Sequence, residues 1–304
     1  MKKYPLIGKC LAVGIILLFV GTSIIPATAQ DIKKQSSTSR GNWLYVGGSG
    51  PGNYSKIQDA IDNASEGDTV FVYSGWYNES ILINKSIVVS GQDRNTTFIV
   101  GGDDLYASIR IGGANVEFRR FTIQKQQGRP YYGISVGDCV NSQIEETCVR
   151  NFDIGIGIYK SDLVIVSNNI IQNCLFGITI SETKNVTIKG NVIEGNEKGY
   201  GMWVGCTKNK NIIMRNTIKN NIEGVYLDRA FFTIVKENNL LQNKHQALFV
   251  DSFFSVWERN YWNRPHLLPK VILGKVFVFY WIGPWLINID WHPAQEPYDI
   301  TGMT

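Results

Sequence analysis

Histidine, methionine and cysteine are scarce in this chain. Its 304 residues include three His, four Met and five Cys, and the histidines lie far apart in the sequence. Copper and similar metals need clusters of such imidazole and sulfur ligands, so the sequence predicts no metal site. His266 and His292, both in the C-terminal tail, are the one pair that folding could bring together.

Strong charge is also missing. A formal charge of +4 and a pI near 8.7 give no basic patch of the kind that nucleic acids require. Long apolar runs are few, and the first one follows Lys2, Lys3 and Lys9 and ends before Ala27-Thr28-Ala29. This order is typical of a cleaved export signal over residues 1–29, with an uncleaved membrane anchor as the alternative. We therefore expect an extracytoplasmic protein, secreted or on the cell surface, with a flexible linker over residues 30–42.

Helical periodicity is nearly absent and appears only over residues 54–64. What the chain has in its place is a repeat of 22 to 24 residues, marked by Gly or Ala before an alternating apolar strand. The repeats start at Gly133, Gly155, Gly177, Gly201, Gly224 and Ala247. A second column at the same period consists of Asn169, Asn191, Asn216, Asn239 and Asn260.

Units of this length that lack helices exclude tetratricopeptide, ankyrin and HEAT repeats. The pattern predicts an all-β fold, a right-handed parallel β-helix over residues 43–262, whose stacked Asn side chains form a hydrogen-bonded ladder. Helix 54–64 would cap its N-terminal end, because an uncovered solenoid end is an adhesive sheet edge.

The N-terminal part carries a family resemblance. The order Leu44-Tyr45-Val46, Ile57-Gln58-Asp59-Ala60-Ile61, Gly67-Asp68-Thr69-Val70 and Lys85-Ser86-Ile87 resembles the opening of pectin-lyase-like β-helix proteins, most of all the NosD-like surface group. The resemblance implies the fold over residues 43–262. It leaves activity open, because the superfamily includes lyases, hydrolases, epimerases and proteins without known catalysis. A NosD-like accessory role in periplasmic metal insertion is one alternative.

The tail, residues 263–304, breaks the repeat and holds five of the nine prolines. We expect it to be an irregular, aromatic and Pro-rich C-terminal cap. Its apolar stretch from Val271 to Ile289 allows a second interpretation, a weak contact with a membrane surface.

Alternation within the repeated strands predicts which side chains point outward. The outward column changes from small residues to aromatic ones at Trp203, Tyr226 and Phe249, with Glu182 nearby. Such a strip can stack on the flat faces of sugars, so these four residues are our candidate ligand-binding residues. Alternatively, the tail folds over the strip and buries it.

Acidic residues follow the same strands. Asp228, Arg229 and Asp251 fall on adjacent coils and are our catalytic candidates, since a lyase, hydrolase or epimerase of acidic polysaccharides needs a base and a cation. Ca²⁺ would be the cofactor only if the chain is a lyase. No lyase signature is present, so we favour a carbohydrate-binding or structural envelope protein without catalysis, whose partner is a polysaccharide or cell-envelope glycan.

Two sets of residues bear on modification after export. Cys139, Cys148, Cys174 and Cys206 do not fall in register, so we expect them to be mainly unpaired. Six Asn-x-Ser/Thr sites are candidate glycosylation acceptors. They are Asn53, Asn63, Asn78, Asn84, Asn95 and Asn185.

Overall fold

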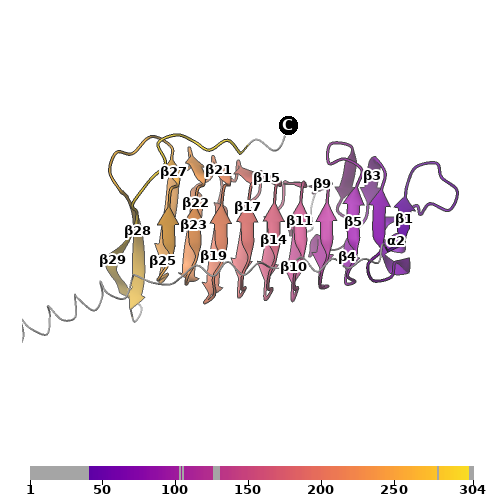
Figure 1. Cartoon of the computed structure of the whole chain (residues 1–304), viewed down its shortest axis with the longest axis horizontal. Helices are drawn as coiled ribbons and strands as arrows, with labels where there is room; N and C mark the ends of the chain where they lie inside the picture. The colour runs from indigo at the N-terminus through magenta and orange to yellow at the C-terminus, as the bar shows by residue number, and fades with distance from the viewer. Residues whose placement is uncertain (1–40, 103, 105, 126–130, 279–280, 301–304) are drawn as a thin grey trace, which may run out of the picture. The chain divides into compact units, whose positions relative to one another are not determined.

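The computed structural model describes residues 41–102, 104, 106–125, 131–278 and 281–300. The predicted export signal and nearly all of the predicted linker lie outside these residues. The described chain forms a right-handed parallel β-helix, which confirms the predicted fold class (Figure 1). Each coil contributes one strand to each of three stacks, and strands one coil apart pair in parallel.

The strands of the first stack carry the candidate site. They are β4 (Ile81–Ile83), β7 (Ala107–Ile111), β10 (Tyr132–Gly137), β13 (Ile154–Tyr159), β16 (Phe176–Ser181), β19 (Tyr200–Thr207), β22 (Glu223–Ala230), β25 (His245–Val250) and β28 (Lys270–Val278). The second stack consists of β1 (Trp43–Val46), β2 (Thr69–Val72), β5 (Val88–Gly91), β8 (Glu117–Arg119), β11 (Gln143–Glu145), β14 (Ile165–Ser167), β17 (Thr187–Lys189), β20 (Ile212–Met214), β23 (Ile234–Lys236), β26 (Val256–Glu258) and β29 (Trp281–Asp290).

The third stack is made of β3 (Gly75–Asn78), β6 (Thr97–Val100), β9 (Thr122–Gln124), β12 (Cys148–Arg150), β15 (Ile170–Gln172), β18 (Val192–Glu194), β21 (Thr217–Lys219), β24 (Asn239–Leu241) and β27 (Tyr261–Trp262). Inward side chains of all three stacks form one continuous core of Ile, Val, Leu and Phe. An antiparallel pairing of β28 with β29 joins the first two stacks at the C-terminal end.

The repeated glycines are required by the close approach of successive coils. A Cβ atom added to Gly155 would lie 2.6 Å from the carbonyl oxygen of Gly177, and one added to Gly201 would lie 2.8 Å from that of Gly224. No real Cβ contact is that short, so a larger residue would push the coils apart. In the last coil Gln246, and not the predicted Ala247, occupies this position, because Val225 pairs with Ala247.

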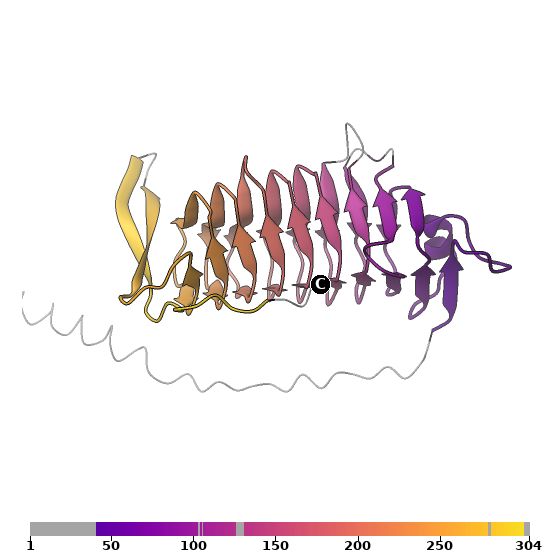
Figure 2. The ribbon, with the colours of Figure 1, turned by 90° about the horizontal axis from the view of Figure 1, so that it is seen from above.

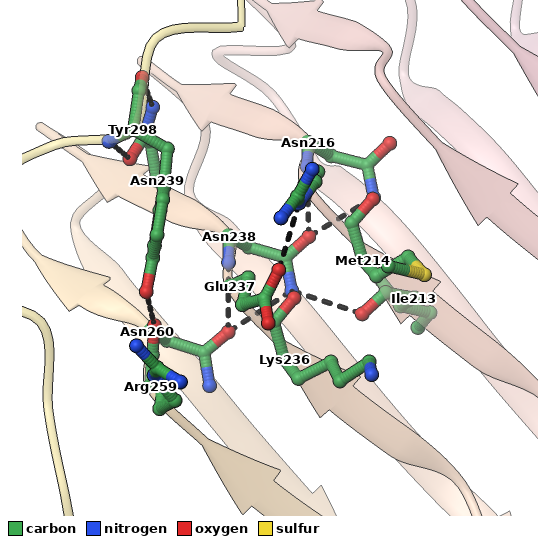
Figure 3. A network of polar contacts seen from close by, with 11 residues as sticks. Ile213, Met214, Asn216, Lys236, Glu237, Asn238, Asn239, Arg259, Asn260 and Tyr298 are labelled. Carbon is green, nitrogen blue, oxygen red and sulfur yellow. Dashed lines mark hydrogen bonds and ion pairs between the residues drawn. The ribbon is translucent and has the colours of Figure 1, made fainter.

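The asparagine column is a ladder inside the core (Figure 3). The Nδ2 atom of Asn216 donates to Oδ1 of Asn238 at 3.0 Å, and Nδ2 of Asn238 donates to Oδ1 of Asn260 at 3.0 Å. Asn238, and not the predicted Asn239, is therefore the member in this coil. Asn239 instead exchanges two 2.8 Å hydrogen bonds with the backbone of Tyr298, which holds the chain end against the coils.

Both ends of the β-helix are covered (Figures 1 and 2). At the N-terminal end lies α2 (Ile57–Asn63), slightly shorter than the predicted 54–64, with Ile57 and Ile61 buried. The Glu79 carboxylate accepts hydrogen bonds from the first amides of α2, and the Lys85 ammonium donates to carbonyls at its last turn. In the described ranges, no helix has both the length and the apolar character of a membrane span.

The C-terminal cap is more regular than the sequence indicated. Strands β28 and β29 form an antiparallel hairpin, in which β28 extends the first stack and β29 reaches the second. The carboxylate of Asp290 is fully buried and ends the asparagine ladder. It accepts hydrogen bonds from the Arg259 and Asn260 amides and from Nε1 of Trp262.

Candidate functional site

The outer face of the first stack carries in-register columns of side chains. Tyr132, Ile154, Phe176 and Tyr200 follow one another at the start of β10, β13, β16 and β19. A second outward column lies three residues further on in each strand, between two inward residues such as Ile134 and Val136. It contains Ser135, Gly157, Thr179, Trp203 and Tyr226.

A groove with a volume of about 620 Å³ lies across these columns. Half of its fourteen lining residues are aromatic, and the others include small side chains and one charge of each sign. The lining residues that the site argument uses are Tyr106, Tyr132, Tyr159, Phe176, Tyr200 and Trp203, together with Gly157, Thr179, Lys160 and Glu182. None of the lining comes from the described residues of the tail, so that part of the tail does not cover this groove.

Small residues on the floor make room for the rings. A Cβ added to Gly157 would lie 2.5 Å from Cε1 of Tyr132, so the Tyr132 ring rests directly on this glycine. The neighbouring rings stack from coil to coil: Phe176 and Tyr200 have centroids 5.1 Å apart at 12°, and Tyr200 and Tyr226 are 5.2 Å apart at 34°. The rings are thus held by one another before any ligand arrives.

The phenol groups of Tyr132 and Tyr226 act as hydrogen-bonding groups and not as bases. Burial, and then the neighbouring Tyr106, raise the pKa of Tyr132 to about 12. Burial, followed by the charge of Asp228, raises the pKa of Tyr226 to about 12. Both hydroxyls therefore stay protonated at neutral pH and can donate hydrogen bonds to ligand oxygens.

The predicted ligand-binding residues separate into three groups. Trp203 and Glu182 line the groove, and Tyr226 lies beside it against Tyr200. Phe249 was predicted to point outward, and that prediction is wrong. It pairs with the inward Leu227, is 1% exposed, and packs over Gly274 of the cap. Leu248 takes the outward position, because a shift of one residue turns a strand over.

The predicted catalytic residues lie beyond the lining of the groove. Arg229 binds Asp228 through two hydrogen bonds of 3.1 Å, and this contact is the main reason that the pKa of Arg229 is raised. Arg229 and Asp251 both adopt the left-handed conformation at the bend after their strands, with φ of 49° and 45°. The structure thus brings Asp228 and Arg229 together, but as an ion pair at a bend.

Several residues of the site were missed in the sequence. Tyr132, Phe176 and Tyr200 each stand immediately before a repeat glycine, and this recurring aromatic–Gly pair was the signal that could have revealed them. A further pair follows in the same column, where Nδ1 of His245 lies 2.7 Å from Oε1 of Glu223.

The four cysteines in the described part of the chain, Cys139, Cys148, Cys174 and Cys206, are unpaired, in line with the prediction that they are mainly unpaired. Burial raises the pKa of the Cys139 thiol to about 11 and that of Cys174 to about 12, so both remain protonated. Throughout the described ranges, no three His, Cys, Asp or Glu side chains gather as a metal site would require. His266 and His292 do not form such a group either.

Comparison with protein families decides what kind of protein carries this groove. A family model described as periplasmic copper-binding protein (NosD) matches residues 61–278. The chain belongs to the NosD family. Membership of a family described as periplasmic supports an extracytoplasmic location for this β-helix protein. Among curated proteins, none matches the sequence.

Solved structures similar to this NosD-family chain share its fold at low sequence identity. Pectate lyase Pel9A is 13% identical with a TM-score of 0.58, over 75% of this chain and 71% of that one. The A-module of mannuronan C-5 epimerase AlgE4 from Azotobacter vinelandii is 15% identical with a TM-score of 0.51, over 67% and 73%. DFA-IIIase from Arthrobacter chlorophenolicus A6 is 15% identical with a TM-score of 0.50, over 73% of each chain. These similarities establish the fold alone.

Copper, which the family description names, does not fit the donors present in the described residues of this NosD-family chain. Copper(I) is held by thiolates, thioethers and imidazoles that converge on one point. Here Cys139 and Cys174 are buried thiols with raised pKa values, and His245 is engaged with Glu223. We therefore derive no copper chemistry from this chain.

Proposed function

We propose that this protein binds an oligosaccharide in the aromatic groove of its first stack. The observation that supports it is the groove itself, about 620 Å³ in volume and lined by rings from successive coils. Sugar rings present flat C–H surfaces that pack on aromatic faces, and their hydroxyls exchange hydrogen bonds with phenols. Lys160 and Glu182 balance each other in charge, which favours an uncharged or weakly charged glycan.

Trp203 is the side chain whose loss should weaken binding most directly. Removing one stacked indole is expected to lower affinity by roughly 10-fold, which corresponds to about 1.4 kcal/mol. The assay is a glycan array followed by calorimetry on any glycan bound, with the wild-type chain and the Trp203→Ala variant.

Trp76 provides a matched control. It is 65% exposed and stacks on Phe98 at 4.2 Å, but it belongs to β3 of the third stack and not to the groove. Trp76→Ala should leave glycan binding unchanged. If the wild-type chain binds no glycan, or if Trp76→Ala and Trp203→Ala weaken binding equally, the proposal is wrong.

The alternative function is a lyase, hydrolase or epimerase of acidic polysaccharides that uses Asp228, Arg229 and Asp251. The observation favouring it is that Asp228 and Arg229 are in contact on the outer face of the sheet. The pairing of the Arg229 guanidinium with Asp228 argues against a free base there. Incubation with uronate polymers, followed by absorbance of unsaturated ends, tests the lyase form. A product that persists in Asp228→Ala excludes the proposed role of that residue.

A further inference from the structure

The hairpin that caps the C-terminal end has an apolar outer face. In its antiparallel register Leu273 pairs with Ile287 and Val271 with Ile289, so these side chains project from one face of the hairpin. Leu273 is 50% exposed, Ile287 58% and Val271 45%. Trp291, just past β29, is 63% exposed.

The opposite face of the same hairpin already fills the core. Ile272 is 2% exposed and Asp290 is fully buried, while Gly274 accommodates the ring of Phe249. The hairpin therefore buries one of its faces in the core and exposes apolar side chains on the other. A terminal element of a solenoid normally presents a polar outer face, because that face meets water.

The loop before β28 exposes two more apolar side chains. Leu267 is 97% exposed and Leu268 is 76% exposed, between Pro265 and Pro269. We call the whole surface the end patch. Its members are Leu267, Leu268, Val271, Leu273, Ile287 and Trp291. A group of exposed apolar side chains on one terminal element marks a place of interaction.

We propose that the end patch docks on the surface of a lipid bilayer that contains anionic headgroups. The segment from Arg264 to Lys275 contains no acidic residue, and Arg264 is exposed beside the patch. The acid of the neighbouring strand, Asp290, is buried under hydrogen bonds. Apolar side chains with Trp and flanking cations are the composition that binds the interface of anionic membranes.

A second copy of the chain is the competing occupant of the end patch. Symmetric packing of two such faces would bring Arg264 of one copy toward Arg264 of the other, and like charges oppose association. An anionic bilayer instead complements this cation.

Co-sedimentation with vesicles tests the proposal. The full chain is mixed with vesicles of phosphatidylcholine alone or of equal amounts of phosphatidylcholine and phosphatidylglycerol. We expect the wild-type chain to bind the mixed vesicles more strongly. The double variant Leu273→Gln with Ile287→Gln should lower partitioning by on the order of 10-fold or more, because two apolar side chains no longer enter the interface.

Two further variants separate docking from folding. Leu267→Gln changes a side chain that is 97% exposed, so it should weaken vesicle binding while the thermal transition stays unchanged. Leu82→Gln, at an exposed leucine of β4, should leave binding unchanged. Absence of wild-type binding to the mixed vesicles overturns the proposal. So does a dimer, seen by sedimentation velocity, that Leu267→Gln dissociates while no vesicle is bound.

Discussion

The substitution Asn216→Ala should destabilise the fold strongly, because it truncates an interior member of the asparagine ladder. Asn216 is fully buried, and its side chain makes five hydrogen bonds. Its Oδ1 accepts from the amide and Nδ2 of Asn191, and its Nδ2 donates to Oδ1 of Asn238 and to the carbonyls of Ile188 and Met214. Alanine removes all five at once.

The cost follows from the groups left behind. The buried backbone amide of Asn191 would lose its partner, and the Ile188 carbonyl would lose this donor; each such group costs about 1–3 kcal/mol. The Nδ2 atom of Asn191 keeps the carbonyls of Val166 and Lys189, and Oδ1 of Asn238 keeps the backbone amide of residue 216. Water that enters the vacated space can satisfy some of them. We therefore expect a loss of about 2–5 kcal/mol in the free energy of unfolding, in the upper part of the usual range for a point substitution or above it.

Urea denaturation followed by far-ultraviolet circular dichroism measures this loss. Asn209→Ala is the matched control, because Asn209 is exposed and its one side-chain hydrogen bond spans 3.5 Å. The control should lie within about 0.5 kcal/mol of wild type. A loss below about 1 kcal/mol for Asn216→Ala, with an unchanged dependence on urea, would refute the view that the ladder stabilises the fold.

Three further predictions concern other parts of the molecule. Lys85→Met removes three ammonium hydrogen bonds to the last turn of α2 and should cost about 1–3 kcal/mol, against no change for the exposed Lys198→Met, both by urea denaturation. The pKa of Tyr226 is about 12 in the folded chain, against about 10 in the unfolded chain, so the unfolded state loses its proton first as the pH rises. The free energy of unfolding should therefore fall between about pH 10 and 12, and it should fall less in Tyr226→Phe. In a glycosylating host, glycopeptide mass spectrometry should find higher occupancy at exposed sequons without a side-chain amide bond than at Asn53, whose amide donates to Gly47 at 2.6 Å. The sequons expected to be occupied are Asn78, Asn84 and Asn95.

The fold was predictable because the same structural position in every coil requires the same type of residue. Coils that approach as closely as Gly155 and Gly177 exclude a Cβ atom, so glycine recurs at that position. A buried bend with unsatisfied backbone groups needs a side chain that both donates and accepts, so asparagine recurs at its own position. Both columns are visible in the sequence without any knowledge of the structure.

Register in the last coils was harder to predict. The glycine position is held by Gln246, and two asparagines stand together at Asn238 and Asn239, so the sequence offers two alignments one residue apart. Side chains alternate with a period of two, and the wrong alignment therefore exchanged the inside and the outside at Phe249. The hydrophobic pattern did not resolve the choice, because Leu248 and Phe249 are both apolar.

The groove lies where a column of small residues adjoins a column of aromatic ones. Its location cannot be predicted from either column alone. The aromatic strip expected at Trp203 and Tyr226 suggested a site on the C-terminal half of the face. The structure instead hollows the middle of that face, where Gly157 leaves space and the flanking Tyr132 and Tyr200 supply the walls. A binding surface on a solenoid is thus formed where small residues in one column adjoin large ones in the next. The same comparison of neighbouring columns, applied to the sequence, would have placed Trp203 at the edge of the site and the tyrosines around it.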